Sequence, residues 1–209
     1  MQQWSNVEMD VAKEIINIGL AKAADSLSFF TKERVMLKGL SLEIKPISEF
    51  AYPKQDDGNA FHVLFTEVKG DIEGTCFLNF REQDAENFWK IALPEAIMNN
   101  PEMKIEMGKA ILMEADNIIA ASVITQFANM LNVNMHGHIP NYHLVEYNDM
   151  NRFILDRSPS SSLYLQFSAE FASDSVDVFP DFLWMLDSSF MKNVQKFIEK
   201  DKTVMVQSK

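Results

Sequence analysis

Apolar residues recur every three to four positions in two long stretches, residues 5–30 and 108–132, a period typical of helices. At the start of the first stretch, Ser5 and Glu8 have the spacing of a capping box. Shorter helical patterns cover residues 82–93, which Pro94 ends, and residues 188–199. The Met- and Asn-containing segment 95–107 is predicted to be a connector.

Extended segments lie between these helices. The pattern predicts strands near residues 35–47, 60–68, 71–80, 143–148, 163–171 and 175–185. The second and third form a hairpin around Lys69-Gly70-Asp71. Pro180 interrupts the last segment and predicts an edge or bulged strand, because proline cannot donate to a sheet ladder.

The order helix, three strands, helix occurs twice, at about 5–100 and 105–200. We therefore predict an α+β fold in which residues 1–209 form a single domain made of two repeats. The repeats are expected to join into one antiparallel sheet with pseudo-two-fold symmetry, and the two long helices to lie together. Two units of this length are too few and too long for a solenoid.

The amino-acid composition limits the classes of partner that the protein can have. The chain has 209 residues, with 30 acidic and 19 basic side chains and a net charge of -11. Binding to nucleic acid is driven by Lys and Arg that release counterions, so we expect no nucleic-acid partner. No apolar run approaches the ~20 residues of a membrane span. The single cysteine, Cys76, cannot form an internal disulfide and is expected to be buried, which suits a cytoplasmic protein.

A polar pair repeats on the two long helical stretches. Glu14 and Asn17 lie three residues apart, and Glu114 and Asn117 follow them 100 residues later. Residues at i and i+3 share a helix face. Asp10 extends the first pair by one turn, within an arc of about 60°. Each half thus presents a carboxylate beside a carboxamide.

The chemistry of such a pair suits positioning. A carboxylate can bind Lys or Arg, and a carboxamide can hold a water molecule without taking its proton. That is sufficient for phosphoryl transfer, where catalysis is mostly positioning and charge stabilisation. Either pair alone is also ordinary on a solvated helix face. The repetition in register is what favours a functional site.

The sequence here resembles the CheC/CheX/FliY chemotaxis phosphatases, most closely the two-site CheC form. Their pattern is Asp or Ser, three residues, Glu, two residues, Asn, then 22 residues and Pro. The second half has Glu114, Asn117 and Pro140 at this spacing, with Ala110 in place of Asp or Ser. The first half has Asp10, Glu14 and Asn17, with Leu40 in place of Pro.

The resemblance implies an enzyme that removes the aspartyl phosphate of a CheY-like response regulator in chemotaxis or two-component signalling. Glu14 and Glu114 would dock on a lysine of the regulator, and Asn17 and Asn117 would align the attacking water. The protein would have no cofactor of its own, because the regulator supplies Mg²⁺. A CheD-like protein is a further implied partner. The alternative is a non-catalytic binding module for a receiver domain, a CheD-like protein or a flagellar-switch component.

Other residues gave weaker hypotheses. His136, His138 and His143 could bind a transition metal in a small-molecule hydrolase, although no cysteine or spaced acid completes the set. Solvent-facing loop histidines are the simpler interpretation. Trp4, Phe29 and Phe30 are predicted to be packing residues.

Overall fold

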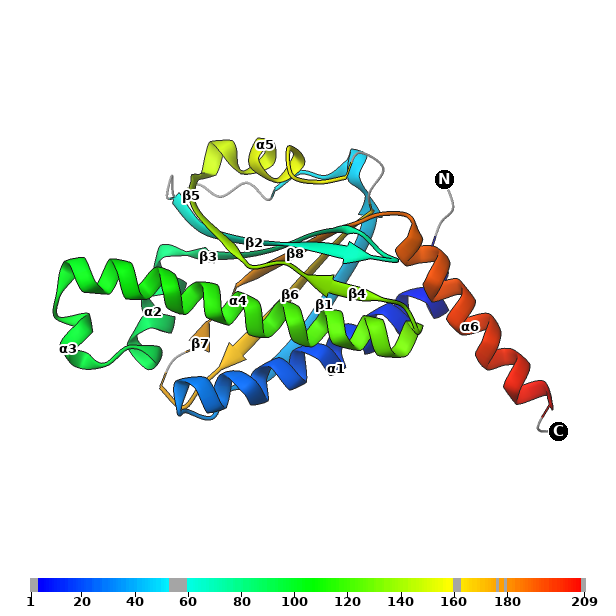
Figure 1. Cartoon of the computed structure of the whole chain (residues 1–209), viewed down its shortest axis with the longest axis horizontal. Helices are drawn as coiled ribbons and strands as arrows, with labels where there is room; N and C mark the ends of the chain where they lie inside the picture. The colour runs from blue at the N-terminus through cyan, green and yellow to red at the C-terminus, as the bar shows by residue number, and fades with distance from the viewer. Residues whose placement is uncertain (1–3, 53–59, 160–162, 176, 179, 208–209) are drawn as a thin grey trace.

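The computed structural model describes residues 4–52, 60–159, 163–175, 177–178 and 180–207, with the side chains of 39–40, 168–170 and 201–207 excepted (Figure 1). Its helices and strands alternate in two similar series. The first series is α1 (Asn6–Thr31), β1 (Met36–Pro46), η1 (Ile47–Glu49), β2 (Ala60–Gly70), β3 (Gly74–Arg81), α2 (Glu82–Ala92) and α3 (Glu95–Met98). The second is α4 (Pro101–Leu131), β4 (Met135–Gly137), β5 (Asn141–Glu146), η2 (Tyr147–Asp149), α5 (Met150–Leu155), β6 (Leu163–Ala172), β7 (Asp177–Val178), β8 (Asp181–Leu186) and α6 (Ser189–Gln207).

The strands form one eight-stranded antiparallel sheet in the order β1-β6-β8-β3-β2-β4, with β5 also on β2 and β7 on β6. The two halves exchange their first strands. β1 pairs with β6 of the second half, and β4 and β5 pair with β2 of the first half. The predicted α+β duplication with pseudo-two-fold symmetry is therefore confirmed, and the symmetry axis passes between β3 and β8.

Two of the predicted boundaries were wrong. Segment 95–107 is not a connector, because it contains α3 and the first two turns of α4. The Asn100 side chain caps α4 by accepting from the backbone N–H of Met103 at 3.2 Å, and Pro101 takes the first helical position, where no N–H is needed. The segment interrupted at Pro180 is divided into β7 and β8 as its proline predicts, but β8 is not an edge strand, because it pairs with both β6 and β3.

The two long helices cover one face of the sheet side by side (Figure 1). The capping box of α1 is present: the backbone N–H of Ser5 donates to Glu8 at 2.6 Å, and the N–H of Glu8 donates to Ser5 Oγ at 3.3 Å. The helices approach closely at Gly19, where a Cβ would lie 2.8 Å from Val123 Cα. This contact fixes how the exposed faces of α1 and α4 sit beside one another.

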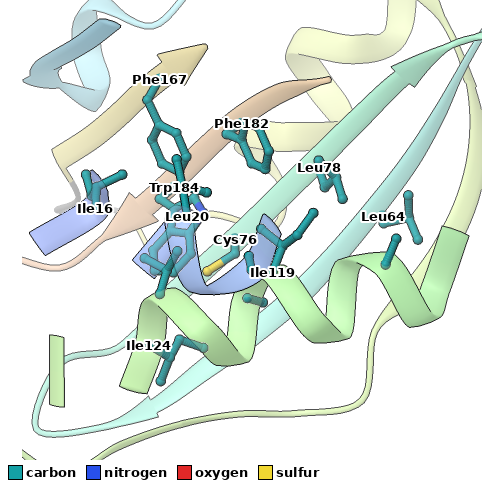
Figure 2. Close-up of a cluster of buried hydrophobic side chains, with 14 of the residues drawn as sticks. Ile16, Leu20, Leu64, Cys76, Leu78, Ile119, Ile124, Phe167, Phe182 and Trp184 are labelled. Carbon is teal, nitrogen blue, oxygen red and sulfur yellow. The ribbon is translucent and has the colours of Figure 1, made fainter. Parts of the chain in front are cut away.

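The main core fills the space between the two helices and the sheet. Figure 2 shows side chains from both layers meeting there: Ile16, Leu20, Leu64, Cys76, Leu78, Ile119, Ile124, Phe167, Phe182 and Trp184. Cys76 is buried as predicted, and burial raises the pKa of its thiol well above the usual value. A smaller core lies on the opposite face of the sheet under α5, built around residues such as Phe61, Phe77 and Met185.

One helix, α4, is long and apolar enough by composition to cross a membrane. Half of its apolar window is buried inside the protein, against α1 and the sheet. The buried half of this window therefore packs within the fold.

Candidate functional site

The structure places both Glu/Asn pairs on solvent-exposed faces of α1 and α4. Glu14, Asn17, Glu114 and Asn117 are all exposed, and none of their side chains makes a hydrogen bond or ion pair within the described part of the chain. Asp10 is exposed one turn before Glu14. Each pair therefore presents a free carboxylate and a free carboxamide to an incoming molecule.

The second pair lies in a groove, which the sequence pattern did not predict. The groove has a volume of about 380 Å³ and combines α4 with the segment between β4 and β5. Asn117 and Glu114 form one wall, while Pro140 and its neighbours form the other; the full lining is Ala110, Met113, Glu114, Asn117, Gly137, His138, Ile139 and Pro140. Tertiary structure thus brings together Glu114, Asn117 and Pro140, the three residues that match the motif.

The position of Pro140 follows from a bulge in the sheet. Gly137 pairs with Val68 and Asn141 pairs with Phe65, so three residues between them oppose two residues of β2. Bulges are where a sheet tolerates proline, because the ladder is interrupted there. The backbone N–H of His138 donates to the carbonyl of Glu67 at 2.8 Å, which holds the start of this segment against β2.

The first half has a similar bulge with a different local structure. Lys38 pairs with Glu170 and Leu40 with Ala169, which leaves one extra residue, Gly39, in an otherwise unbroken β1. Leu40 therefore lies at the position equivalent to Pro140, but in a continuous strand. Because proline interrupts a strand ladder and leucine does not, β1 continues through Leu40 whereas the equivalent segment of the second half is interrupted at Pro140.

A network of polar and aromatic side chains fixes the groove wall. Tyr142, two residues after Pro140, contacts His62 Nδ1 through its hydroxyl at 2.8 Å. His62 is buried, and its Nε2 lies 2.9 Å from Glu82. The Lys109 ammonium lies 5.3 Å from the centre of the Tyr142 ring, so the network connects β5 to the helix that carries the pair.

The three histidines do not form a metal site. Within the described ranges, no group of three or more His, Cys, Asp or Glu side chains is arranged to hold a metal ion. His138 Nδ1 is 3.8 Å from Glu67, whereas the His143 ring stacks on Phe65. Burial and the charge of Arg157 lower the pKa of His143. The structure thus gives no support to the metal-dependent hydrolase.

Two side chains near the second pair were misassigned or missed from the sequence. Phe29 is not a packing residue, because its side chain is 91% exposed, whereas Trp4 does pack on the core and against Phe190. Phe29 is two residues from the buried Leu27 and from Thr31, so the helical period itself places it on the outer face. Asp116 is buried, and its place four residues after Leu112 puts it on the apolar stripe.

The arrangement defines a class of fold, an antiparallel sheet with a duplicated long helix that displays Glu and Asn. No protein-family model matches the chain. The solved structure of FliY from Thermotoga maritima is similar, with a TM-score of 0.70 and 16% identity over 95% of this chain and 99% of that one. A CheX–CheY–BeF3–Mg²⁺ complex from Borrelia burgdorferi gives a TM-score of 0.55 and 17% identity, covering 84% and 99%.

The FliG–FliM complex from H. pylori shares the fold at a TM-score of 0.58 and 11% identity, covering 90% of this chain and 100% of that one. Among curated proteins, the CheY-P phosphatase CheC of Bacillus subtilis (strain 168) is 22% identical over 139 residues. The match covers 64% of this chain and 64% of that protein. These matches confirm the resemblance to CheC, CheX and FliY, and the chain has the fold that these proteins share.

Proposed function

We propose that this protein hydrolyses the aspartyl phosphate of a CheY-like receiver domain. The proposal rests on one observation above all: Glu114 and Asn117 stand free and side by side in the groove that Pro140 closes. The similarity to a CheY-P phosphatase supports it, as does the fold shared with a CheX that is seen in complex with CheY.

In this mechanism the Glu114 carboxylate pairs with a lysine of the receiver, and Asn117 then reaches the phosphoryl group. The Asn117 carboxamide oxygen accepts a hydrogen bond from a water molecule and holds it in line with the scissile P–O bond. Water attacks phosphorus, the bond to the aspartyl oxygen breaks, and the carboxylate leaves with the electron pair. Inorganic phosphate is released, and the proton of the water goes to phosphate or solvent, since a carboxamide cannot take it.

The Mg²⁺ needed to neutralise the phosphoryl oxygens belongs to the receiver in this proposal. Glu14 and Asn17 supply the same two groups on α1, with Asp10 preceding them, and act as a second site. Pro140 sets the groove wall of the second pair, so we assign the larger share of the activity to Glu114 and Asn117. The free thiol of buried Cys76 suits a reducing, cytoplasmic location.

The experiment is turnover of a panel of receivers from the same cell. Each receiver is loaded with a small phosphodonor and Mg²⁺, excess donor is removed, and loss of the aspartyl phosphate is followed with and without this protein. Asn117→Ala is expected to lower the rate by ~10²-fold, the usual order for losing a positioning group. Asn17→Ala is expected to have a smaller effect, and the double substitution to abolish the acceleration.

The alternative is a non-catalytic module that docks a receiver, a CheD-like protein or a flagellar-switch component. Ala110 in place of Asp or Ser favours it, as does the fold shared with FliM bound to FliG. Binding that survives the double Asn substitution, with no hydrolysis by the unmodified protein, would support this alternative. Acceleration that the double substitution abolishes would reject it.

A further inference from the structure

A second groove borders the same Glu114 from the side of α1. It has a volume of about 1270 Å³ and lies between the C-terminal end of α1 and the middle of α4. Phe29, Lys32 and Arg34 line it from the first half, and Glu114 and Ile118 line it from α4. Glu114 is therefore shared by both grooves and stands on the ridge between them.

Each groove carries one unusually exposed apolar side chain. Phe29 is 91% exposed and Ile139 is 81% exposed, the two highest values among the large apolar side chains that the structure describes. They come from distant parts of the sequence, yet both border the ridge at Glu114. Exposed apolar groups that converge on a polar site mark a protein-binding surface more often than isolated ones do.

The first Glu/Asn pair does not share this feature. Asn129 stands 100 residues after Phe29, at the equivalent place on α4, and its side chain is exposed. Pseudo-two-fold symmetry therefore puts a polar residue beside Glu14 where Phe29 stands beside Glu114. The difference is local to the two sites, because the helices themselves are equivalent.

The residue that both grooves share identifies the occupant, because Glu114 is the carboxylate that pairs with a lysine of the receiver in the proposed function. The larger groove carries charges of both signs: Lys32 and Arg34 line it together with Asp25, Glu33 and Glu114. A phosphorylated receiver also presents both signs, the lysine that pairs with Glu114 and the carboxylates that hold Mg²⁺. Complementary charges of this kind fix the orientation and specificity of docking more than its affinity.

We propose that Phe29 and Ile139 are the apolar anchors by which a phosphorylated receiver domain docks over Glu114. This inference rests on the proposed function and adds the residues that select the second pair over the first. The anchors are expected to act on affinity and not on the chemical step, because an apolar side chain has no group that can hold or activate the attacking water.

The test separates binding from chemistry. Affinity is measured for each receiver loaded with beryllofluoride and Mg²⁺, and kcat and KM are measured with the phosphorylated receiver. Phe29→Ala and Ile139→Ala are each expected to raise Kd and KM about tenfold or more, as truncation of an interface anchor does, with kcat unchanged. Two control variants are expected to leave Kd unchanged. Asn129→Ala is at the position equivalent to Phe29 by symmetry, and Ile105→Ala removes an exposed apolar side chain (56%) of α4 that lines neither groove.

The outcomes are distinct for the anchors and for the enzyme. Hydrolysis that requires Asn117 but tolerates Phe29→Ala and Ile139→Ala would reject the anchors and keep the phosphatase. Receiver binding that requires both anchors, without hydrolysis, would keep the docking surface and reject the phosphatase. Failure to bind any receiver, or concentration-dependent self-association that Phe29→Ala abolishes, would overturn the proposed occupant.

Discussion

Asp116 gives the protein a stability that depends on pH in a defined direction. It lies on α4 between Glu114 and Asn117 but faces the core, and its side chain is only 2% exposed. The hydroxyl of Thr66 on β2 donates to its Oδ2 at 2.8 Å. Burial raises the pKa of Asp116 to about 7, because the charged carboxylate loses its solvation, and the Thr66 hydrogen bond offsets only part of this rise.

The sign follows from comparing the folded and unfolded chains. In the unfolded chain the Asp116 pKa is near its ordinary value of 3.8. Between pH 4 and 7 the unfolded chain therefore releases a proton that the folded protein keeps, so the free energy of unfolding falls as pH rises. The contribution is fully present below pH 4 and lost above pH 7. At ~1.4 kcal/mol per pKa unit, the complete loss is about 4 kcal/mol.

Asp116→Asn removes this titration while its carboxamide oxygen can still accept from Thr66. Relative to the unmodified protein, the variant is expected to gain about 3 kcal/mol in free energy of unfolding between pH 4.5 and pH 8. Urea unfolding followed by tryptophan fluorescence at the two pH values measures this gain, independently of any constant offset between the proteins. Glu106→Gln, which removes an exposed carboxylate from the same helix, is the matched control.

A stability difference between Asp116→Asn and the unmodified protein that does not change with pH would refute the argument. So would an equal pH-dependent change in Glu106→Gln, because burial would then not be the cause. Thr66→Val provides a second check. Losing the hydroxyl removes the one hydrogen bond that lowers the Asp116 pKa, so the midpoint of the pH-dependent loss is expected to move upward.

Three further predictions concern packing and backbone conformation. Gly19→Ala is expected to lower the free energy of unfolding in urea by about 1–2 kcal/mol, because its Cβ would lie 2.8 Å from Val123 Cα. A variant as stable as the unmodified protein would mean that α1 and α4 can move apart without cost. Trp89→Phe loses the buried hydrogen bond from Nε1 to the carbonyl of Gly108 at 3.0 Å, and thermal unfolding is expected to show a loss of about 1–2 kcal/mol in the free energy of unfolding. An equal loss in Trp4→Phe would show that this hydrogen bond is not the cause. Lys32, at the end of α1, has a left-handed backbone conformation with φ of 60°, so Lys32→Gly is expected to raise the free energy of unfolding by roughly 1 kcal/mol. If Lys32→Gly is no more stable than Lys22→Gly, a substitution in the middle of the helix, the prediction is wrong.

Local pattern was sufficient for much of the fold. The period of three to four residues located α1, and the Ser5–Glu8 spacing located its first turn. The same reasoning started α4 too late, because the Asn100-Pro101 cap was interpreted as part of a connector. Alternation located β2 and β3, and Pro180 located the break between β7 and β8. These are signals between residues close in sequence, which is why a single sequence reveals them.

Part of the candidate site could likewise be predicted from residue spacing, and part only from the tertiary structure. Glu14, Asn17, Glu114 and Asn117 could be placed on exposed helix faces from spacing alone, since i and i+3 share a face on any helix. The resemblance gave Pro140 a place in the motif, but that Pro140 lines one groove with Asn117 is known only from the tertiary structure. The grouping of Phe29 and Ile139 around Glu114 could not be predicted, because it joins α1 and the β4–β5 segment across the body of the protein.

By itself, therefore, the sequence determined the long helices, most of the longer strands, the duplication and the two Glu/Asn pairs, all of which depend on neighbours along the chain. Only the tertiary structure decided that the halves exchange strands and that one pair is flanked by apolar side chains. It also decided that Asp116 is buried against Thr66 of β2 while Glu114 and Asn117 stay in solvent. Such outcomes depend on which helix faces and strand edges meet, and residues distant in sequence decide that together.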